Sequence, residues 1–513
     1  MSTRERPQNT TPREIETAGE PRDEILSARL GERPAGATAA AAGDEARASS
    51  VFARIGSLLL ASGLIGAVGW AAYANAAPSF TGEAASVLVQ PKPGEQQRVC
   101  AGPVITLGLQ GQQTAAAANG QTRLVGAGDT HLSSASPIAS VGGPATGDAA
   151  SPVVYRAPGE RTDGEATQFA VTQTVQLPGG QGKPSGFTAT ECQMPTGDQW
   201  VIADGPSSGT SSVLSLANVT ERPATVQLHV RSPEGPVDAG KLSEIEIPAM
   251  SQRAISVAAI APQTHSVAIR VVSTQGLVAP SVHQVLTAGL SGRGAEISPA
   301  TLAPTTRLVI PGVPMSSGTV AGDTDSAATT LVRMLNTGAG EVNATVRILG
   351  LDGTEIRRDE VVLQPGQVVD DSLAELPSGI GTILVDADGP VIAAARSMVA
   401  SGGTGADVAW YQAAARLGGE AQVAVPDGPS PRLFIANTGQ ETLPVSIERS
   451  GEPAKQLEIP AGQTAQVDVN PGTYRVTGLE SAHAAVTYAG QSALASFPVT
   501  SSNPLAEPIT VYR

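Results

Sequence analysis

The chain has 513 residues, a formal net charge of −15 and an aromatic content of 3%. The acidic balance argues against nucleic acid and anionic lipid headgroups as partners, because both carry negative charge. So few aromatic residues are insufficient for a platform on which sugars or bases stack in series.

The first 54 residues are rich in Arg, Glu, Pro, Ala and Thr and contain few large apolar side chains. Such a segment cannot bury enough surface to offset the entropy lost on ordering, so we expect 1–54 to be a disordered tail. Residues 55–77 then run for 23 positions without a charged side chain. As a helix they would extend about 35 Å, which exceeds the roughly 30 Å hydrocarbon core of a bilayer. The pattern predicts one transmembrane helix.

Basic residues flank this apolar segment on one side only. Arg47 and Arg54 precede it, and the next basic residue is Lys92. Positive charge stays on the cytoplasmic side of a membrane, so we expect a cytoplasmic tail and an extracellular C-terminal region. The sequence thus predicts a single-pass protein of the cell membrane.

The tripeptide Ala74-Asn75-Ala76 also matches the cleavage pattern of a signal peptide. Cleavage after Ala76 is therefore an alternative to an uncleaved anchor, although the apolar run is longer than the usual ~7–15 residues. Both interpretations export the C-terminal part.

Residues 81–199 contain both cysteines of the chain, Cys100 and Cys192. Outside the membrane such a pair most often forms a disulfide, and no Cys-x-x-Cys spacing or nearby His suggests a metal pair instead. Short apolar runs predict strands here, so we expect a disulfide-bridged β domain. Residues 111–151 lack apolar periodicity and are predicted to be a mobile loop within it.

From Trp200 onward the chain repeats one pattern three times, over 200–304, 305–420 and 421–513. Each copy has a short apolar strand, a Gly/Pro turn, a second strand ending in Asn, and a strand with alternating apolar residues. The turns are Asp204-Gly205-Pro206, Gly312-Val313-Pro314 and Asp427-Gly428-Pro429. Alternation with period two indicates one buried and one solvated face, as in antiparallel sheets.

Two landmarks recur in order in all three copies. The second strand ends in Asn218, Asn336 or Asn437, and a later turn contains Pro248, Pro365 or Pro460. Asn satisfies backbone groups at turns, and proline suits an edge or a turn because it cannot donate to a ladder. The pattern predicts a mainly β protein of tandem β-sandwich domains resembling immunoglobulin or fibronectin type III modules, after one transmembrane helix.

No residue set predicts catalysis, a metal site or a cofactor, so the chain is not predicted to be an enzyme. Asp204 and Asp427 occupy equivalent turns, and we interpret them as turn residues because Asp-Gly is common turn chemistry. Trp200 and Trp410 each precede a repeat and are predicted to pack between domains or in cores. The five histidines pair with no nucleophile and are interpreted as surface positions: His131, His229, His265, His283 and His483.

Several of these features together resemble an actinobacterial envelope family, domain-of-unknown-function family 5719. The matching elements are the N-terminal anchor, VCAGP around Cys100, Cys192 followed by Trp200, and strands that end in Asn with ATV-type strands behind them. The chain departs from its own pattern at Val219, where the other copies have Thr337 and Thr438. The resemblance covers roughly residues 85–500 and implies a secreted or tethered β protein that supports cell-envelope assembly, without an assigned activity.

These observations predict a membrane-anchored extracellular protein with a structural or adaptor role in the bacterial cell envelope. Its partner would be another envelope protein or a cell-wall polymer, because serial sandwiches present edges and loops. The alternative is an accessory factor that binds or processes envelope carbohydrate at an inter-domain cleft.

Overall fold

The computed structural model describes residues 86–89, 92–110, 113–129, 135–140, 146–147, 151–315, 317–319, 327–401, 405–502 and 509–512. The predicted tail and transmembrane helix, 1–54 and 55–77, lie outside these residues. No helix within the described ranges is both long and apolar enough to cross a membrane. The described chain is mainly β, as the sequence predicts, and its two short helices are η1 (Gly240–Leu242) and α2 (Val257–Ile260).

The N-terminal part contains two sheets, in the orders β10-β9-β5-β7 and β2-β8-β6, and the hairpin β3-β4. Their strands are β2 (Gln96–Cys100), β3 (Val104–Gln110), β4 (Gln113–Asn119), β5 (Gln121–Gly128), β6 (Ala135–Pro137), β7 (Thr146–Gly147), β8 (Val153–Ala157), β9 (Phe169–Pro178) and β10 (Ser185–Glu191).

The prediction of a mobile loop over 111–151 is wrong where the structure describes this segment. Strand β4 pairs with β3 along its whole length, and β5 pairs with β9 over eight residues. Ala, Thr and Gly dominate β4 and β5, so local apolar periodicity is weak. Their partner strands supply the backbone hydrogen bonds, which the local pattern does not reveal.

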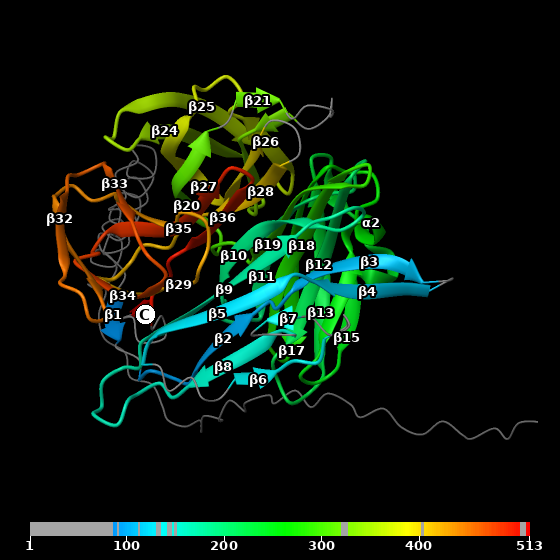
Figure 1. The fold of residues 1–513 in the computed structure, drawn as a ribbon, viewed down its shortest axis with the longest axis horizontal. Coiled ribbons are helices and arrows are strands. Elements are labelled where there is room, and N and C mark those ends of the chain that lie inside the picture. The colour runs from blue at the N-terminus through cyan, green and yellow to red at the C-terminus, as the bar shows by residue number, and fades with distance from the viewer. Residues whose placement is uncertain are drawn as a thin grey trace, which may run out of the picture. The chain divides into compact units, whose positions relative to one another are not determined.

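The first repeat comprises the strands from β11 to β19 in two sheets (Figure 1). One has the order β11-β17-β13-β14 with β15 beside β13, and the other has the order β16-β12-β18-β19. Apolar residues from both sheets form one core. The strands are β11 (Asp198–Asp204), β12 (Thr210–Asn218), β13 (Ala224–Ser232), β14 (Gly235–Val237), β15 (Glu244–Ile247), β16 (Gln252–Ser256), β17 (Ser266–Gln275), β18 (Val278–Ala288) and β19 (Ser291–Pro299).

The second repeat is organised around one long strand, β27, whose halves pair with different partners. Its first half pairs with β20 and β24, and its second half pairs with β23 and β28. The strands are β20 (Thr305–Met315), β21 (Ser317–Thr319), β22 (Ala327–Thr329), β23 (Leu331–Asn336), β24 (Val342–Gly350), β25 (Glu355–Leu363), β26 (Val368–Ser372), β27 (Gly379–Ser401) and β28 (Gly405–Gln412). Residues 352–353 form the hairpin turn between β24 and β25.

The predicted turn at Gly312-Val313-Pro314 is wrong, because these residues lie inside β20. The register with β27 shifts between Ile310 and Val313, and Gly312 has φ +72°. A β-bulge, which needs such a glycine conformation, thus replaces the turn. A Cβ on Gly312 would also lie 2.6 Å from the Phe434 ring.

The third repeat, like the first, has two sheets; each has four strands, in the orders β29-β34-β31-β32 and β33-β30-β35-β36. The strands are β29 (Glu420–Val425), β30 (Arg432–Asn437), β31 (Leu443–Arg449), β32 (Lys455–Ile459), β33 (Thr464–Asp468), β34 (Gly472–Thr477), β35 (Ala482–Gly490) and β36 (Ala493–Pro498). A separate ladder pairs β1 (Ser86–Val89) with β37 (Ile509–Tyr512).

The three landmark asparagines make the same set of hydrogen bonds in the three repeats. In the second repeat, the Asn336 Nδ2 donates to the carbonyls of Gly340 (2.7 Å) and Leu363 (2.9 Å), and its Oδ1 accepts from Gly338 N (2.8 Å). The equivalent bonds are those of Asn218 with Arg222, Ile247 and Thr220, and those of Asn437 with Glu441, Ile459 and Gly439. Each buried amide thus joins its turn to the end of a later strand.

The landmark prolines lie in the turns that these amides hold. Pro365 bridges directly to Asn336, and the next residue, Gly366, donates its N–H to the Asn336 carbonyl at 3.0 Å. In the third repeat Gly462, two residues after Pro460, makes the same bond to Asn437. In the first repeat the Asn218 amide donates to the Pro248 carbonyl at 3.0 Å.

We predict that Asn336→Asp destabilises the protein by about 2–4 kcal/mol, because a carboxylate would face two buried carbonyls that have lost their donor. The exposed Asn470 offers a matched control, and Asn470→Asp should change stability by less than about 0.5 kcal/mol. Chemical denaturation of the two variants measures the difference. Equal midpoints would contradict the role given to Asn336.

Candidate functional site

The predicted disulfide is present and closes the N-terminal part. Cys100 ends β2 and is bonded to Cys192, which follows β10. Both are buried against Phe169 and Val171 of β9. In the chain-entropy model a link that closes 92 residues contributes on the order of 4 kcal/mol.

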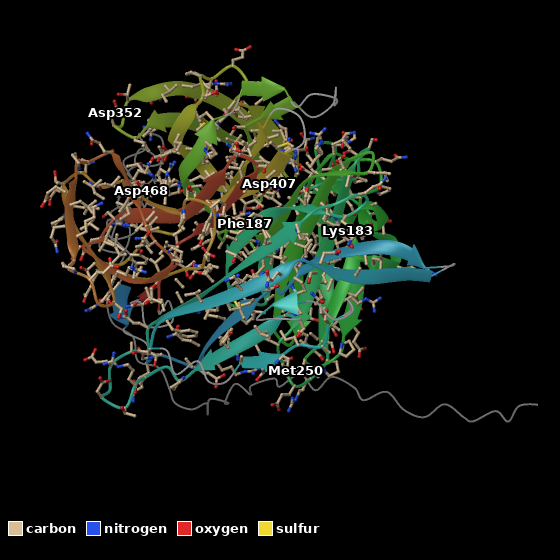
Figure 2. The ribbon with its side chains drawn as sticks, in the orientation of Figure 1. Lys183, Phe187, Met250, Asp352, Asp407 and Asp468 are labelled. Atoms are coloured by element: carbon tan, nitrogen blue, oxygen red, sulfur yellow. A yellow bond between two sulfur atoms is a disulfide. The ribbon has the colours of Figure 1, made fainter. Side chains whose placement is uncertain are left out.

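Four edge strands meet at a second point, around the buried carboxylate of Asp407. The Asp407 Oδ2 accepts backbone N–H groups from Phe187 of β10 (2.9 Å) and Leu494 of β36 (3.1 Å). The Oδ1 accepts from Ala295 of β19 (3.1 Å) and from Val408 of β28 itself (3.0 Å). Figure 1 shows these four strands close together, and Figure 2 shows Asp407 near Phe187. We call this arrangement the Asp407 hub.

Each strand of the hub ends a sheet and is the second strand of a hairpin: β9-β10, β18-β19, β27-β28 and β35-β36. The N-terminal part therefore contributes a terminal hairpin like those of the three repeats. Sheet edges expose unpaired backbone groups that must be covered. The Asp407 carboxylate accepts one backbone N–H group from each of the four edges.

Close approach to the carboxylate requires glycine at two positions of the hub. A Cβ on Gly186 would lie 2.7 Å from Asp407 Oδ1, and one on Gly294 would lie 2.9 Å from it. Their φ angles, +139° and +135°, are also rare for other residues. Neither glycine can therefore be replaced by a residue with a Cβ while Asp407 keeps this position.

A second buried acid, Glu296 of β19, lies beside Asp407. Burial raises the pKa of Glu296, and the charge of Asp407 raises it further; Thr188 donates a hydroxyl bond to Glu296 at 3.2 Å. Burial also raises the pKa of Asp407, but its four N–H donors act in the opposite direction by favouring the carboxylate. The negative charge of the pair is therefore assigned to Asp407 and the proton to Glu296.

We predict that Asp407→Asn destabilises the protein by about 3–5 kcal/mol, because the amide NH2 would point at backbone donors in place of an acceptor. The exposed Asp427 serves as the control, and Asp427→Asn should leave stability within about 0.5 kcal/mol of the parent. Thermal unfolding of the two purified variants compares them. A parental midpoint for Asp407→Asn would show that the hub does not depend on the carboxylate.

A network of charged side chains joins the first repeat to the second. Arg333 donates two bonds to Asp370, each at 2.7 Å, and pairs with Asp204 at 3.1 Å. Asp204 also accepts from Arg396 and Gln284, both at 2.7 Å. Two arginines balance two aspartates, so the network is neutral overall; Arg333 and Asp204 are buried, whereas Asp370 lies at the surface.

The interpretation of Asp204 as a turn residue is therefore incomplete. Its carboxylate is buried, and the charges of Arg396 and Arg333 hold its pKa below the ordinary value although burial opposes this. Asp427 is exposed and makes no equivalent network. The two aspartates thus occupy matching sequence positions and different environments.

Trp200 and Trp410 pack where the first two repeats meet, as the sequence predicts. Both belong to one apolar cluster with Ile202, Leu335 and Ile392. The Trp410 indole N–H donates to the Gln284 side chain at 3.2 Å, and the Arg333 guanidinium lies 5.1 Å from the Trp410 ring centre. The tryptophan thus connects the apolar cluster to the charged network.

The prediction that all histidines lie at the surface is wrong for His283 and His483. His283 is fully buried, with its Nδ1 accepting the Ile105 N–H at 3.0 Å and its Nε2 3.1 Å from the Ser281 hydroxyl. His483 is buried against the Ala414 carbonyl. His229 and His265 are exposed as expected, and His131 lies outside the described residues.

The Ser281–His283 contact is not a nucleophile–base pair. Because the Nδ1 accepts a backbone N–H, the proton of the neutral ring lies on Nε2 and is donated to Ser281. Burial also lowers the pKa of His283 to about 3, so the ring stays neutral. His283 therefore cannot take a proton from the serine, and the pair serves to dock β3.

A third buried acid holds the C-terminal segment against β10. Glu191 accepts the backbone N–H and the hydroxyl of Thr500, at 3.1 and 2.8 Å. Burial raises the pKa of Glu191 to about 7, against the opposing effects of the Arg98 charge and of these two bonds. Glu191 thus titrates near neutrality in the folded protein.

We predict that stability falls by about 1–3 kcal/mol as the pH rises from 5 to 8, because of Glu191. Its unfolded pKa is near 4.5 and its folded pKa near 7. Between these values the folded state binds more protons, so raising the pH favours unfolding, and the effect ends above the folded value. Glu191→Gln should flatten this slope in denaturation midpoints measured at both pH values. An unchanged slope in that variant would assign the dependence to another group.

The described surface has a cleft of about 450 Å³ beside β11 and β17. Arg270 and Asp198 form an ion pair at its edge, and Arg270 lies 5.9 Å from the centre of the Trp200 ring. The lining residues are Gln193, Met194, Thr196, Asp198, Gln199, Trp200, Arg270, Ala300, Thr301, Ala303, Pro304 and Thr337. The cleft thus combines hydroxyl, amide and charged groups with one indole side chain.

Within the described ranges no three His, Cys, Asp or Glu side chains are grouped so as to hold a metal ion. The model of a family of unknown function, DUF5719, matches residues 143–470. The chain belongs to this family. No curated protein matches the chain.

Sequence reasoning missed Asp407, Glu296, Arg333 and Glu191. Asp407 lies in the run GADVAWYQ, which carries no motif. One signal was available, since a charged residue inside an otherwise apolar strand is buried only when it is paired. The partners, from 37 to 309 residues away, could not be named from the sequence.

Proposed function

We propose that this DUF5719 protein is a membrane-tethered, exported scaffold or adaptor of the bacterial cell envelope, of the actinobacterial type that the resemblance implies. Its repeats would be immunoglobulin- or fibronectin-like sandwiches beyond a single transmembrane helix at 55–77. The apolar run and its basic flank support the tether. The Cys100–Cys192 disulfide supports export, because disulfides persist in oxidising compartments.

The observation that carries the scaffold role is the use made of buried charge. The buried acids and arginines contact backbone or side chains of neighbouring units: Asp407 contacts three other hub strands, Arg333 contacts the first repeat, and Glu191 contacts the C-terminal segment. A catalytic group must remain available to its substrate. Buried groups that already bond neighbouring units are not available to a substrate, so they favour a structural role over catalysis.

The partner would be another envelope protein or a cell-wall polymer. Exposed loops and free sheet edges are the groups with which a scaffold of this type binds others. The negative net charge continues to argue against nucleic acid.

A second candidate function is the binding of envelope carbohydrate in the cleft beside Trp200. The cleft favours it because sugars are bound by convergent hydroxyl, amide and charged groups near an aromatic ring. Binding of purified wall glycan to the protein, reduced in Arg270→Ala, would support this function. The control is Arg475→Ala, which removes another surface arginine from its ion pair with a carboxylate, that of Glu420.

Cysteine labelling in intact cells tests the proposed topology. Both native cysteines form the disulfide, so a single introduced cysteine reports its own location. Leu290→Cys places a thiol at a side chain that is 64% exposed, and it should react with a membrane-impermeant maleimide in intact cells. Thr10→Cys, in the predicted cytoplasmic tail, should react only after lysis. Labelling of Leu290→Cys only after lysis would contradict export.

Cross-linking in the same cells separates the two functions. Recovery of one specific envelope protein, with no binding of wall glycan by the purified chain, is the result expected of a scaffold or adaptor. Glycan binding that depends on Arg270, without a protein partner, would instead select the carbohydrate function.

A further inference from the structure

Strand β25 forms a free edge of the second repeat. It pairs with β24 on one side and ends its sheet on the other. Its outward-facing side chains are exposed along the strand, from Ile356 through Arg358 and Glu360 to Val362. The strand has nine residues, and the backbone groups of alternate residues point to the free side, where they can pair.

This edge carries apolar side chains where the equivalent edges do not. Ile356 is 45% exposed and Val362 is 54% exposed, so β25 holds two of the four large apolar side chains that are exposed in the described chain. In the first and third repeats the equivalent strands are β15 and β32, which pair with β13 and β31 as β25 pairs with β24. Their exposed residues are charged or polar: Glu244, Glu246, Lys455, Gln456 and Glu458. Such residues protect an edge from pairing, and β25 lacks this protection at two positions.

The sequence of β25 is complementary to itself in one antiparallel register. When Asp359 faces the Asp359 of a second copy, Arg358 faces Glu360 and Ile356 faces Val362. Shifting the register by two residues in either direction destroys these matches, because Arg358 would meet either Arg358 or Val362. Opposite charges and apolar pairs across strands stabilise an antiparallel ladder.

We propose that β25 pairs with β25 of a second copy of this chain, about a two-fold axis through Asp359. The two sheets then join into one continuous sheet, and each dimer contains two Arg358–Glu360 pairs. Such isologous pairing is the common geometry of homodimers. Arg358 also bonds Glu355 of its own strand, at 2.9 and 3.1 Å, which holds the guanidinium at the edge.

Two features of β25 affect this pairing: the acidic residue on the axis and a bulge near one end of the strand. Two Asp359 carboxylates meet on the axis, but each is paired with Arg357 of its own chain. A register shift opposite Ile348 and Leu349 places a bulge at Ile356. Bulges turn an edge away from its neighbour, so we assign the regular ladder to residues 357–361, with Ile356 and Val362 packing at its ends.

Because Asp359 lies on the proposed two-fold axis, disulfide cross-linking at this position tests the dimer directly. Opposite residues of an antiparallel pair have Cα atoms about 4.5–5.5 Å apart, which a disulfide can span. Asp359→Cys should therefore give a covalent dimer when the full-length detergent-solubilised protein is mildly oxidised. The control is Glu458→Cys on the matching edge strand β32, which should remain monomeric on the same gel. Equal cross-linking of the two variants would overturn the proposal.

A charge swap tests the register without a new cysteine. Arg358→Glu and Glu360→Arg should each raise the dimer dissociation constant roughly tenfold or more, because like charges then face each other twice in the dimer. The double variant should restore the parental constant to within about threefold, since the opposite charges are re-formed. Sedimentation velocity of the full-length proteins measures all four constants. A monomeric parent, or a double variant no better than the single ones, would overturn the proposal.

Discussion

A single carboxylate that accepts backbone N–H groups from four sheet edges is the constraint on which the described structure depends. Asp407 receives one donor from each of β10, β19, β28 and β36. Each of these strands would otherwise present an unpaired edge, and each belongs to a different sheet. The fixed oxygen positions therefore set how closely the four units approach. Gly186 and Gly294 follow from the same requirement, because a side chain at either position would meet the carboxylate.

Buried charged groups also hold units together elsewhere in the molecule. The Arg333–Asp370–Asp204 network connects the first two repeats, and Glu191 holds Thr500 beside β10. Charged groups in a low-dielectric interior are costly unless they are paired, so each pairing defines one arrangement of its units. This use of charge connects the units of the described chain to one another.

The sequence was sufficient to predict the features that depend on local patterns. Period-two alternation identified β13, and the recurring Asn residues identified strand ends, because each depends on neighbours within a few residues. The disulfide followed from the number of cysteines. The bulge at Gly312, the Ala-rich strand β4 and the buried Asp407 were not predictable in this way. Each depends on a partner far away in the chain: Phe434 for Gly312, the facing strand for β4, and three other hub strands for Asp407.

Native-state hydrogen exchange of the four hub amides tests the central role of Asp407 most directly. The amides of Phe187, Ala295, Val408 and Leu494 share one acceptor group, so opening the hub should expose all of them together. We expect one common free energy of opening for the four amides, near the highest in the protein. Separate values for the four amides, with Leu494 of the third repeat exchanging while the other three stay protected, would contradict the central role of Asp407.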